Sequence, residues 1–390
     1  MKLKEVTISA NTGLDAIKRA PIVEENTGIK CIRIQDISQK KEYDDWGNTL
    51  TTEKDYKNFK LEINDLLVAR TGATVGVSYL VKKDYNAVFN NGSIRLRFND
   101  KVNTRFVYYI FQTNSFRQYI DNVSCVATQP NLRVENLLRF NIPDIEKRIQ
   151  DSIVSRIEKL DDLIECNVKR IKVLEEMAEK LYKEWFVRFR FPGYETMEFE
   201  VKSPKGWILG DKEATLIPSN WHYGELKEIG EFIRGKNITA DKMIEGEVPV
   251  ISAGISPSGY HNVPNVFGGC ITISASGANA GYLLYHLNDI WVADCSYYQN
   301  SENLWFVYNS LKFLQPVISN MQAGAAQPHV YPKHVNRICM IIPEKKWISK
   351  YCEIVSPIYD EIKVLKKKND NLIKQRDLLL PRLMSGKLEV

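Results

Sequence analysis

The stretch TGATVG at residues 71–76 decides the fold, because it recurs as SGANAG at residues 276–281 with both glycines and the alanine in register. The two copies are 205 positions apart in a chain of 390 residues. Further out, LKEV at residues 3–6 recurs as LKEI at residues 226–229. Self-similarity over a long period is the signature of a duplicated structural unit, so the sequence predicts two modules of one fold.

Two more landmarks follow in the same order in both halves. ATQPN at residues 127–131 corresponds to AAQPH at residues 325–329, and an Ile-Pro pair at residues 142–143 recurs at 342–343. The offsets fall to 198 and 200 positions, as insertions and deletions in loops would produce. Each motif is weak evidence alone, but their common order is hard to obtain by chance. We therefore expect an α+β protein with two mixed α/β modules.

Composition limits the class of protein. The chain is 44% hydrophobic and 26% charged, which is ordinary for a soluble globular protein and unlike a disordered or membrane protein. Its length predicts about two domains. Seven widely spaced cysteines lack a C-x-x-C pair, and no signal peptide or long apolar run occurs, so we expect a cytoplasmic protein with reduced thiols. A net charge of +5 permits an acidic partner and weakly favours nucleic acid.

A heptad-like seam follows each module. The first seam consists of Ile157, Leu160, Ile164, Asn167, Ile171, Leu174, Ala178, Leu181 and Trp185. The second consists of Ile348, Tyr351, Val355, Ile358, Ile362, Leu365, Asn369, Leu372, Arg376 and Leu379. Alternating spacings of three and four residues predict two long helices that pair as a coiled coil. Two separate amphipathic helices, each packed on its own module, are the alternative. Pro357 is expected to start or kink the second helix, with Ser356 as its cap.

One asparagine in each seam suggests how the helices pair. If they run antiparallel with Asn167 opposite Asn369, apolar residues face one another along most of the seam, and the Asn pair fixes the register at some expense in stability. A seam of about 28 residues would hold the modules on the order of 40 Å apart, about one turn of DNA. This arrangement predicts a pseudo-twofold repeat whose two diverged modules meet two different half-sites.

Three stretches carry a resemblance to a known family. They are EWFVRFRFPGY at residues 184–194, RDLLLPRLMSGKL at residues 376–388 and IPSNW at residues 217–221. The first two resemble the central and distal conserved regions of the specificity subunit of type I restriction-modification systems, and the third resembles the start of its second target-recognition domain. The resemblance covers essentially the whole chain.

The resemblance implies a DNA reader that is not itself catalytic. Two target-recognition domains would read a bipartite, asymmetric site in double-stranded DNA, and the helices would act as a ruler. The helices would also dock two modification subunits, which methylate adenine N6, and restriction subunits would complete a nuclease and translocase. S-adenosylmethionine, ATP and Mg²⁺ are then expected in the partner subunits and no cofactor in this chain.

The implied domain boundaries follow the landmarks. We expect a first target-recognition domain at residues 1–145, a central long helix at 146–186, a linker with the start of the second repeat at 187–220, a second target-recognition domain at 221–345, and a distal long helix with the C-terminal tail at 346–390.

Polar and basic residues near the repeated motifs are the candidate DNA contacts. The turn residues are Arg70, Thr71, Gly72, Thr74, Ser276, Gly277 and Asn279; the loop residues are Gln129, Asn131, Gln327 and His329; further basic residues are Arg95, Arg97, Arg133, Lys333 and Arg337. Arginine suits guanine or phosphate, and amides suit adenine. Plain hairpin turns, loop-stabilising amides and solvated arginines are the corresponding structural alternatives.

Signatures of catalysis are missing from the sequence. No Walker A loop, no G-x-G-x-x-G after a strand, no H-E-x-x-H and no N/D-P-P-Y/F loop for a flipped adenine occurs, and His329 and His334 have no cysteine or carboxylate partners for a metal. Two rival functions stay open. An enzyme with nucleotide chemistry at the glycine turns would bind nucleotides alone, and a coiled-coil scaffold would bind proteins without any sequence preference on DNA.

Overall fold

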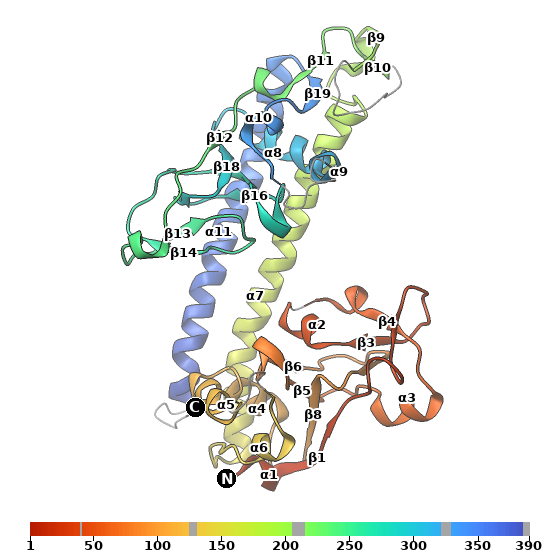
Figure 1. The fold of residues 1–390 in the computed structure, drawn as a ribbon, viewed down its shortest axis with the longest axis vertical. Helices are drawn as coiled ribbons and strands as arrows, with labels where there is room; N and C mark the ends of the chain where they lie inside the picture. Colours follow the sequence, from red (N-terminus) through yellow and green to blue (C-terminus); the bar gives the residue numbers. More distant parts are fainter. Residues whose placement is uncertain (40, 125–130, 205–214, 321–328, 385–390) are drawn as a thin grey trace. The chain divides into compact units, whose positions relative to one another are not determined.

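The chain divides into two units in the computed structural model, which describes residues 1–39, 41–124, 131–204, 215–320 and 329–384. The first unit is Met1–Cys166 together with the C-terminal segment from Asn369, and the second is Asn167–Lys368. The two long helices α7 (Lys147–Tyr182) and α11 (Lys345–Met384) each contribute to both units (Figure 1). Each unit thus combines a globular α/β domain with part of both long helices.

The globular domain of the first unit contains many short elements. They are α1 (Leu3–Val6), β1 (Thr7–Thr12), β2 (Ile22–Val23), β3 (Lys30–Ile32), α2 (Ile34–Ser38), η1 (Tyr43–Asp45), β4 (Gly47–Thr49), α3 (Glu53–Phe59), β5 (Leu66–Ala69), η2 (Gly72–Thr74), β6 (Ser78–Leu80), β7 (Ala87–Phe89), β8 (Ser93–Phe98), α4 (Thr104–Ile110), α5 (Asn114–Ser124) and α6 (Val134–Leu138).

The second unit follows the same plan after a connecting segment. Its elements are η3 (Lys183–Val187), η4 (Tyr194–Thr196), β9 (Phe199–Lys202), β10 (Thr215–Pro218), β11 (His222–Glu225), η5 (Leu226–Glu228), β12 (Ile233–Arg234), η6 (Ala240–Lys242), β13 (Val248–Ile251), β14 (Gly259–His261), β15 (Cys270–Ser274), η7 (Gly277–Asn279), β16 (Leu283–His286), β17 (Trp291–Val292), β18 (Cys295–Tyr298), α8 (Leu304–Phe313), α9 (Gln315–Asn320), α10 (Pro332–Val335) and β19 (Cys339–Ile342).

Sheet topology confirms the duplication that the motifs predict. The central sheet of the first unit has the order β1-β8-β5-β6, and that of the second has β12-β18-β15-β16. Every neighbouring pair in both sheets is antiparallel. A smaller sheet repeats as well, because β3 pairs parallel with β7 and β13 pairs parallel with β17. The fold class is therefore α+β with two modules of one topology.

Apolar strands build the core of each domain. All four residues of β5 and all five of β15 are buried, as expected for strands in the middle of a sheet with both faces covered. In the first unit the core continues through α4 and α5 to the C-terminal part of α11, where Leu380 and Leu383 are buried among the same residues. The last turns of α11 are thus part of the core of the first domain.

The long helices run antiparallel within the second unit. Arg170 pairs with Glu361 at 3.0 Å, and the Tyr351 hydroxyl donates to the carbonyl of Ala178 at 3.0 Å. As the residue number rises along α7, its partner's number falls along α11, so the predicted antiparallel pairing is confirmed there. Predicted seam residues pack in one cluster in this unit: Ala178, Val355 and Ile362 are buried, and Ile171, Leu174, Leu181 and Ile358 lie against them.

Three details of the predicted helices are corrected. The second helix begins at Lys345 and continues through Pro357, which lies on its exposed side. A proline has no backbone N–H to donate, and the Glu353 carbonyl that loses this donor is on an exposed residue. Near the end of α11 the buried leucines are Leu380 and Leu383, whereas Leu379 is 37% exposed. A period of 3.6 residues drifts from a strict heptad, and here the helix packs against a globular core as well.

The two seam asparagines fall in different units. Asn369 is buried and Asn167 is half-buried. Their mutual pairing, the separation of the modules and the pseudo-twofold relation stay predictions. Arg376, expected in the apolar seam, instead donates to the Asp161 carboxylate at 2.9 Å within the first unit.

A π-helical turn ends the first long helix. Residues Lys183–Val187 form this turn, and the adjacent Trp185 and Phe186 are both buried in the core of the second unit. The turn carries these two aromatic side chains into the core at the point where the long helix ends. Arg188 and Arg190 are exposed and pair with Glu184.

The stack of Tyr359 on Trp305 should dominate the stability of the second unit. The two rings lie 3.5 Å apart between centroids at an interplanar angle of 3° and join α11 to α8. We expect Tyr359→Ala to lower the free energy of unfolding by about 3 kcal/mol or more, because it leaves a cavity in an aromatic core. Urea unfolding followed by tryptophan fluorescence measures this change.

Val364→Ala is the matched control, because Val364 lies on the same helix and is 46% exposed. This variant should change the free energy of unfolding by less than about 0.5 kcal/mol. Equal losses in the two variants would show that the stack does not hold the domain to the helix.

Candidate nucleic-acid interface

The repeated glycine motif forms the same hairpin turn in both units. In the first unit it joins β5 to β6, and the Gly76 amide donates to the Ala69 carbonyl at 2.9 Å. Both motif glycines have positive φ in each copy: 78° and 87° for Gly72 and Gly76, and 74° and 76° for Gly277 and Gly281. Only glycine adopts this conformation readily, so these glycines are needed to shape the turn.

The second predicted motif lies directly beside the first. In the first unit Thr71 is bridged to Asn131, and the Leu132 amide donates to the Arg70 carbonyl at 2.7 Å. In the second unit Ser276 is bridged to His329, and the Val330 amide donates to the Ala275 carbonyl at 3.0 Å. Segments 60 residues apart in the first unit and 53 residues apart in the second thus meet at one edge of each domain. We call this edge the turn face.

Arg70 defines the turn face of the first unit. Its Nη2 donates to the Asn131 side-chain oxygen at 3.3 Å. Asn131 and Arg133 are exposed beside it, and Thr71 and Thr74 are half-buried on the turn. The structure therefore brings together five residues that the sequence singled out. Their guanidinium, amide and hydroxyl groups can meet phosphate oxygens or base edges.

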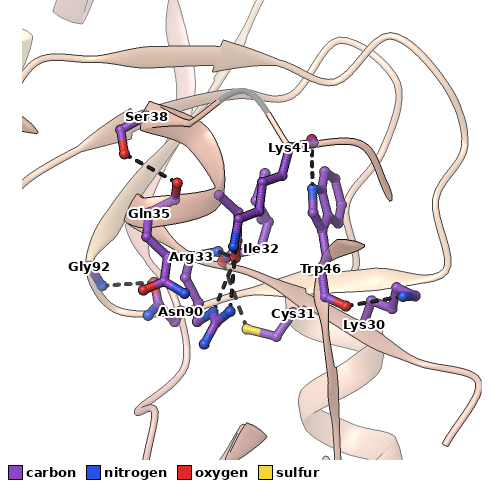
Figure 2. A network of polar contacts seen from close by, with 11 residues as sticks. Lys30, Cys31, Ile32, Arg33, Gln35, Ser38, Lys41, Trp46, Asn90 and Gly92 are labelled. Atoms are coloured by element: carbon purple, nitrogen blue, oxygen red, sulfur yellow. Dashed lines mark hydrogen bonds and ion pairs between the residues drawn. The ribbon is translucent and has the colours of Figure 1, made fainter. Parts of the chain in front are cut away.

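A second basic group lies next to this face. Asp36 is buried and accepts from the Arg33 side chain at 3.1 Å, while Lys41 pairs with it at 3.3 Å (Figure 2). One carboxylate between two cations leaves an excess of one positive charge. Gly92 lies between Arg70 and the Arg33–Asp36–Lys41 group. A side chain at position 92 would clash with Ile34 of α2, and the Gly92 carbonyl accepts a hydrogen bond from the Arg70 amide at 2.9 Å.

The turn face of the second unit carries different side chains. Its arginine is Arg234, at the end of β12, which forms an ion pair with Asp294. The Ser276 hydroxyl donates to the other Asp294 oxygen at 2.8 Å. Arg234 also lies over the Tyr331 ring, at 5.7 Å from the centroid, and His329 stacks on that ring at 5.6 Å.

The remaining predicted residues of the second unit surround this group or lie elsewhere. Lys333 is exposed, with its amine 5.9 Å from the Tyr331 centroid. Gly277 is exposed and Asn279 half-buried on the turn. Arg337 is more than half exposed and faces Glu225 at 3.8 Å. Gln129 and Gln327 lie outside the described residues.

One predicted DNA contact is corrected by the structure. Arg95 is 4% exposed and donates to the backbone carbonyls of Lys60 and Asn58 at 3.0 and 3.1 Å, so it joins two segments of the core and is not offered to DNA. Arg97 pairs with the buried Asp65 and with Glu62, but its side chain is 30% exposed, so its contact with DNA stays a prediction.

Sequence reasoning missed Arg33, Arg234, Asp294 and Tyr331. A signal for one of them existed, since Tyr331 follows His329 by two positions. The pairing of Arg234 with Asp294 joins residues 60 positions apart and has no local pattern.

The hairpin of the second unit is attached to both long helices. Tyr285, on β16 directly after the turn, donates from its hydroxyl to Glu175 of α7. Lys366 of α11 donates to the same hydroxyl at 2.9 Å and lies 4.3 Å from the ring centroid. Burial and the Glu175 carboxylate raise the pKa of Tyr285, so the phenol stays protonated. The turn face is therefore held in a fixed position on the helices of its own unit.

Neither a metal cluster nor a membrane span is found in the described parts of the chain. No three His, Cys, Asp or Glu side chains gather there as metal ligands. None of the helices in those parts is long and apolar enough to cross a bilayer.

Comparison with known proteins identifies a common family. A sequence model of the family described as type I restriction modification DNA specificity domain matches residues 1–176 and 218–375. The MjaIX specificity subunit of a type I restriction enzyme from Methanocaldococcus jannaschii is 26% identical over 362 residues, which cover 88% of this chain and 83% of the relative. The HindI specificity subunit from Haemophilus influenzae is 22% identical, covering 80% and 82%.

A solved structure shares the fold. The crystal structure of the type I restriction-modification S subunit from M. genitalium superposes with a TM-score of 0.55 at 19% identity, covering 98% of this chain and 95% of that one. At this identity the likeness concerns the fold alone.

His286 should make the second unit sensitive to acid. Burial lowers its pKa from 6.5 to about 4, and its Nε2 lies 2.8 Å from the Thr272 hydroxyl. Below about pH 6.5 this histidine binds a proton in the unfolded chain but not in the folded chain. The free energy of unfolding therefore falls as the pH drops toward 4, by at most about 1.4 kcal/mol per pH unit. Thermal unfolding between about pH 7 and pH 5 measures the slope.

His286→Asn removes the titrating group and should flatten this slope. If wild type and His286→Asn lose stability in parallel on acidification, His286 is not the group responsible.

Proposed function

The chain belongs to the family of type I restriction-modification DNA specificity domains, and we propose that it reads a bipartite, asymmetric site in double-stranded DNA. Each globular domain is a target-recognition domain that reads one half of the site. The turn face provides the contacts to bases and phosphates. The helices set the distance between the two readers.

One observation carries this proposal. Both units place a glycine hairpin beside a returning segment, through the Thr71–Asn131 and Ser276–His329 bridges, yet the exposed side chains differ. The first face has Arg70 and Asn131, and the second has Arg234 with aromatic rings. A shared backbone frame with different side chains is what two readers of different base sequences require, because base edges are read by side chains.

The long helices fit a role in assembly. Large apolar side chains are exposed on them in each unit: Leu163, Ile373, Leu378 and Leu379 in the first, and Val168, Val173, Met177, Ile354 and Val364 in the second. Exposed apolar groups along one element are typical of protein interfaces. We propose that these surfaces dock two adenine-N6 methyltransferase subunits, and that nuclease and translocase subunits join the complex through them.

Chemistry then belongs to the partner subunits. S-adenosylmethionine would bind the methyltransferase subunits, and ATP and Mg²⁺ the nuclease and translocase subunits, with no cofactor in this chain. The sequence supports this assignment, because it contains neither a Walker A loop nor the N/D-P-P-Y/F loop that holds a flipped adenine.

A genome-wide map of methylated adenines tests the proposal. Cells that contain the modification subunit are compared with and without this chain. We expect a gapped, asymmetric motif that appears only when the chain is present. The control is the modification subunit alone, which should give no such motif. An active methyltransferase with no chain-dependent motif would contradict the proposal and favour a scaffold without base reading.

A further inference from the structure

Arg234 is the residue that distinguishes the turn face of the second unit from that of the first. In the central sheet Arg234 pairs with Ser296, and the corresponding pair in the first unit is Thr12 with Ile94. The first unit has its arginine at position 70 on the turn, where the second has Ala275. The two domains thus bring one arginine to the same edge from different places in the fold, Arg70 from the turn after β5 and Arg234 from β12.

The Asp294 carboxylate holds Arg234 in one orientation. One oxygen accepts from Arg234 Nη2, and the other accepts from Ser276 at 2.8 Å. The Tyr331 ring lies beneath the guanidinium on a different segment. A side chain fixed before binding loses less conformational entropy on contact with a ligand, which favours specific recognition.

The guanidinium still faces solvent despite these contacts. The Arg234 side chain is 42% exposed and that of Asp294 is 30% exposed. Its described hydrogen bond uses one of the five N–H donors that an arginine carries. Two adjacent donors of a planar fork match the O6 and N7 acceptors of guanine in the major groove.

The neighbouring carboxylate decides between a base and a phosphate as the ligand. A phosphate brought to Arg234 would also approach the negative charge of Asp294, which is unfavourable. A guanine edge carries no net charge and is not repelled in this way. Lys333 is exposed at the margin of the face and has no carboxylate partner among the described residues, so it suits phosphate better.

We propose that Arg234 reads a guanine in the half-site of the second domain, with Asp294 as its positioning residue. This inference rests on the proposed function, because it names the base contact of one recognition domain. It also assigns the two halves of the site to different arginines, Arg70 in the first domain and Arg234 in the second.

A binding competition with the assembled methyltransferase complex tests the assignment. The probe is a duplex library in which each base of the wild-type motif is varied in turn, at one fixed salt concentration. Arg234→Ala should lower discrimination at one guanine of one half-site by about 5- to 150-fold and leave the other half-site unchanged. The intact half-site shows that the variant chain is folded and assembled.

Three further variants sharpen the result. Arg234→Lys retains the charge without the fork and should lose most of the discrimination while binding DNA at near wild-type strength. Asp294→Asn should weaken discrimination at the same guanine only. Lys345→Ala removes a charge at an 86%-exposed side chain of the same unit and should leave every base preference as in wild type.

Several outcomes would overturn the inference. Unchanged base preferences in Arg234→Ala would show that Arg234 reads no base. A uniform loss of affinity over all duplexes, with a weaker dependence on salt, would identify a phosphate contact instead. Loss of discrimination at a base other than guanine would refute the chemical assignment. If the wild-type complex shows no base preference, the proposed function itself fails.

Discussion

In each unit, the packing of the globular domain onto the long helices is the constraint on which the other features depend. In the second unit Trp305 stacks on Tyr359, and Tyr285 reaches Glu175 and Lys366 on the two helices. In the first unit the Asp161 carboxylate accepts from Tyr109 at 2.7 Å and from Arg376 at 2.9 Å. Both units use a tyrosine hydroxyl that donates to a carboxylate of α7, together with a cation of α11, and the second unit adds the aromatic stack. These contacts fix each domain to both helices. A turn face can be read as a defined surface only because its domain is fixed in this way.

Duplication with divergence explains how one chain can offer two surfaces. The backbone frame repeats in strand order, in the positive φ of the motif glycines and in the bridge beside each turn. The backbone frame and the contact residues can then change independently. The geometry of the hairpin depends on its glycines and backbone hydrogen bonds, whereas recognition depends on the exposed side chains. Arg70 and Arg234 show the result, since one follows β5 and the other lies on β12, yet they reach equivalent edges.

The sequence revealed those features that follow from local patterns. The helical seam could be predicted because its repeat is visible within a single helix. The two modules could be predicted because glycines with positive φ cannot be replaced freely, so the repeated glycine motif stays recognisable in both halves. The structural role of Arg95 could not be predicted from the sequence. In β8, Ile94 and Leu96 lie on one face and Arg95 and Arg97 on the other, which is the pattern of a strand with one exposed face. The ion pair of Arg95 with Asp65, 30 residues away in sequence, shows that the second face is also covered. Leu379 was misassigned for the same reason, since the buried side of α11 there is set by the first domain. Arg234 lies on a strand of two residues, too short to show any pattern.

Cross-linking from the two turns would test most directly whether one chain holds two independent readers. A photoreactive residue replaces Thr74 in the first turn or Asn279 in the second, and each assembled complex is irradiated on a duplex that carries the methylated motif. We expect the residue at position 74 to cross-link to bases of one half-site and that at position 279 to bases of the other. Cross-links from both turns to the same half-site, or from neither turn to DNA, would contradict the two-reader interpretation.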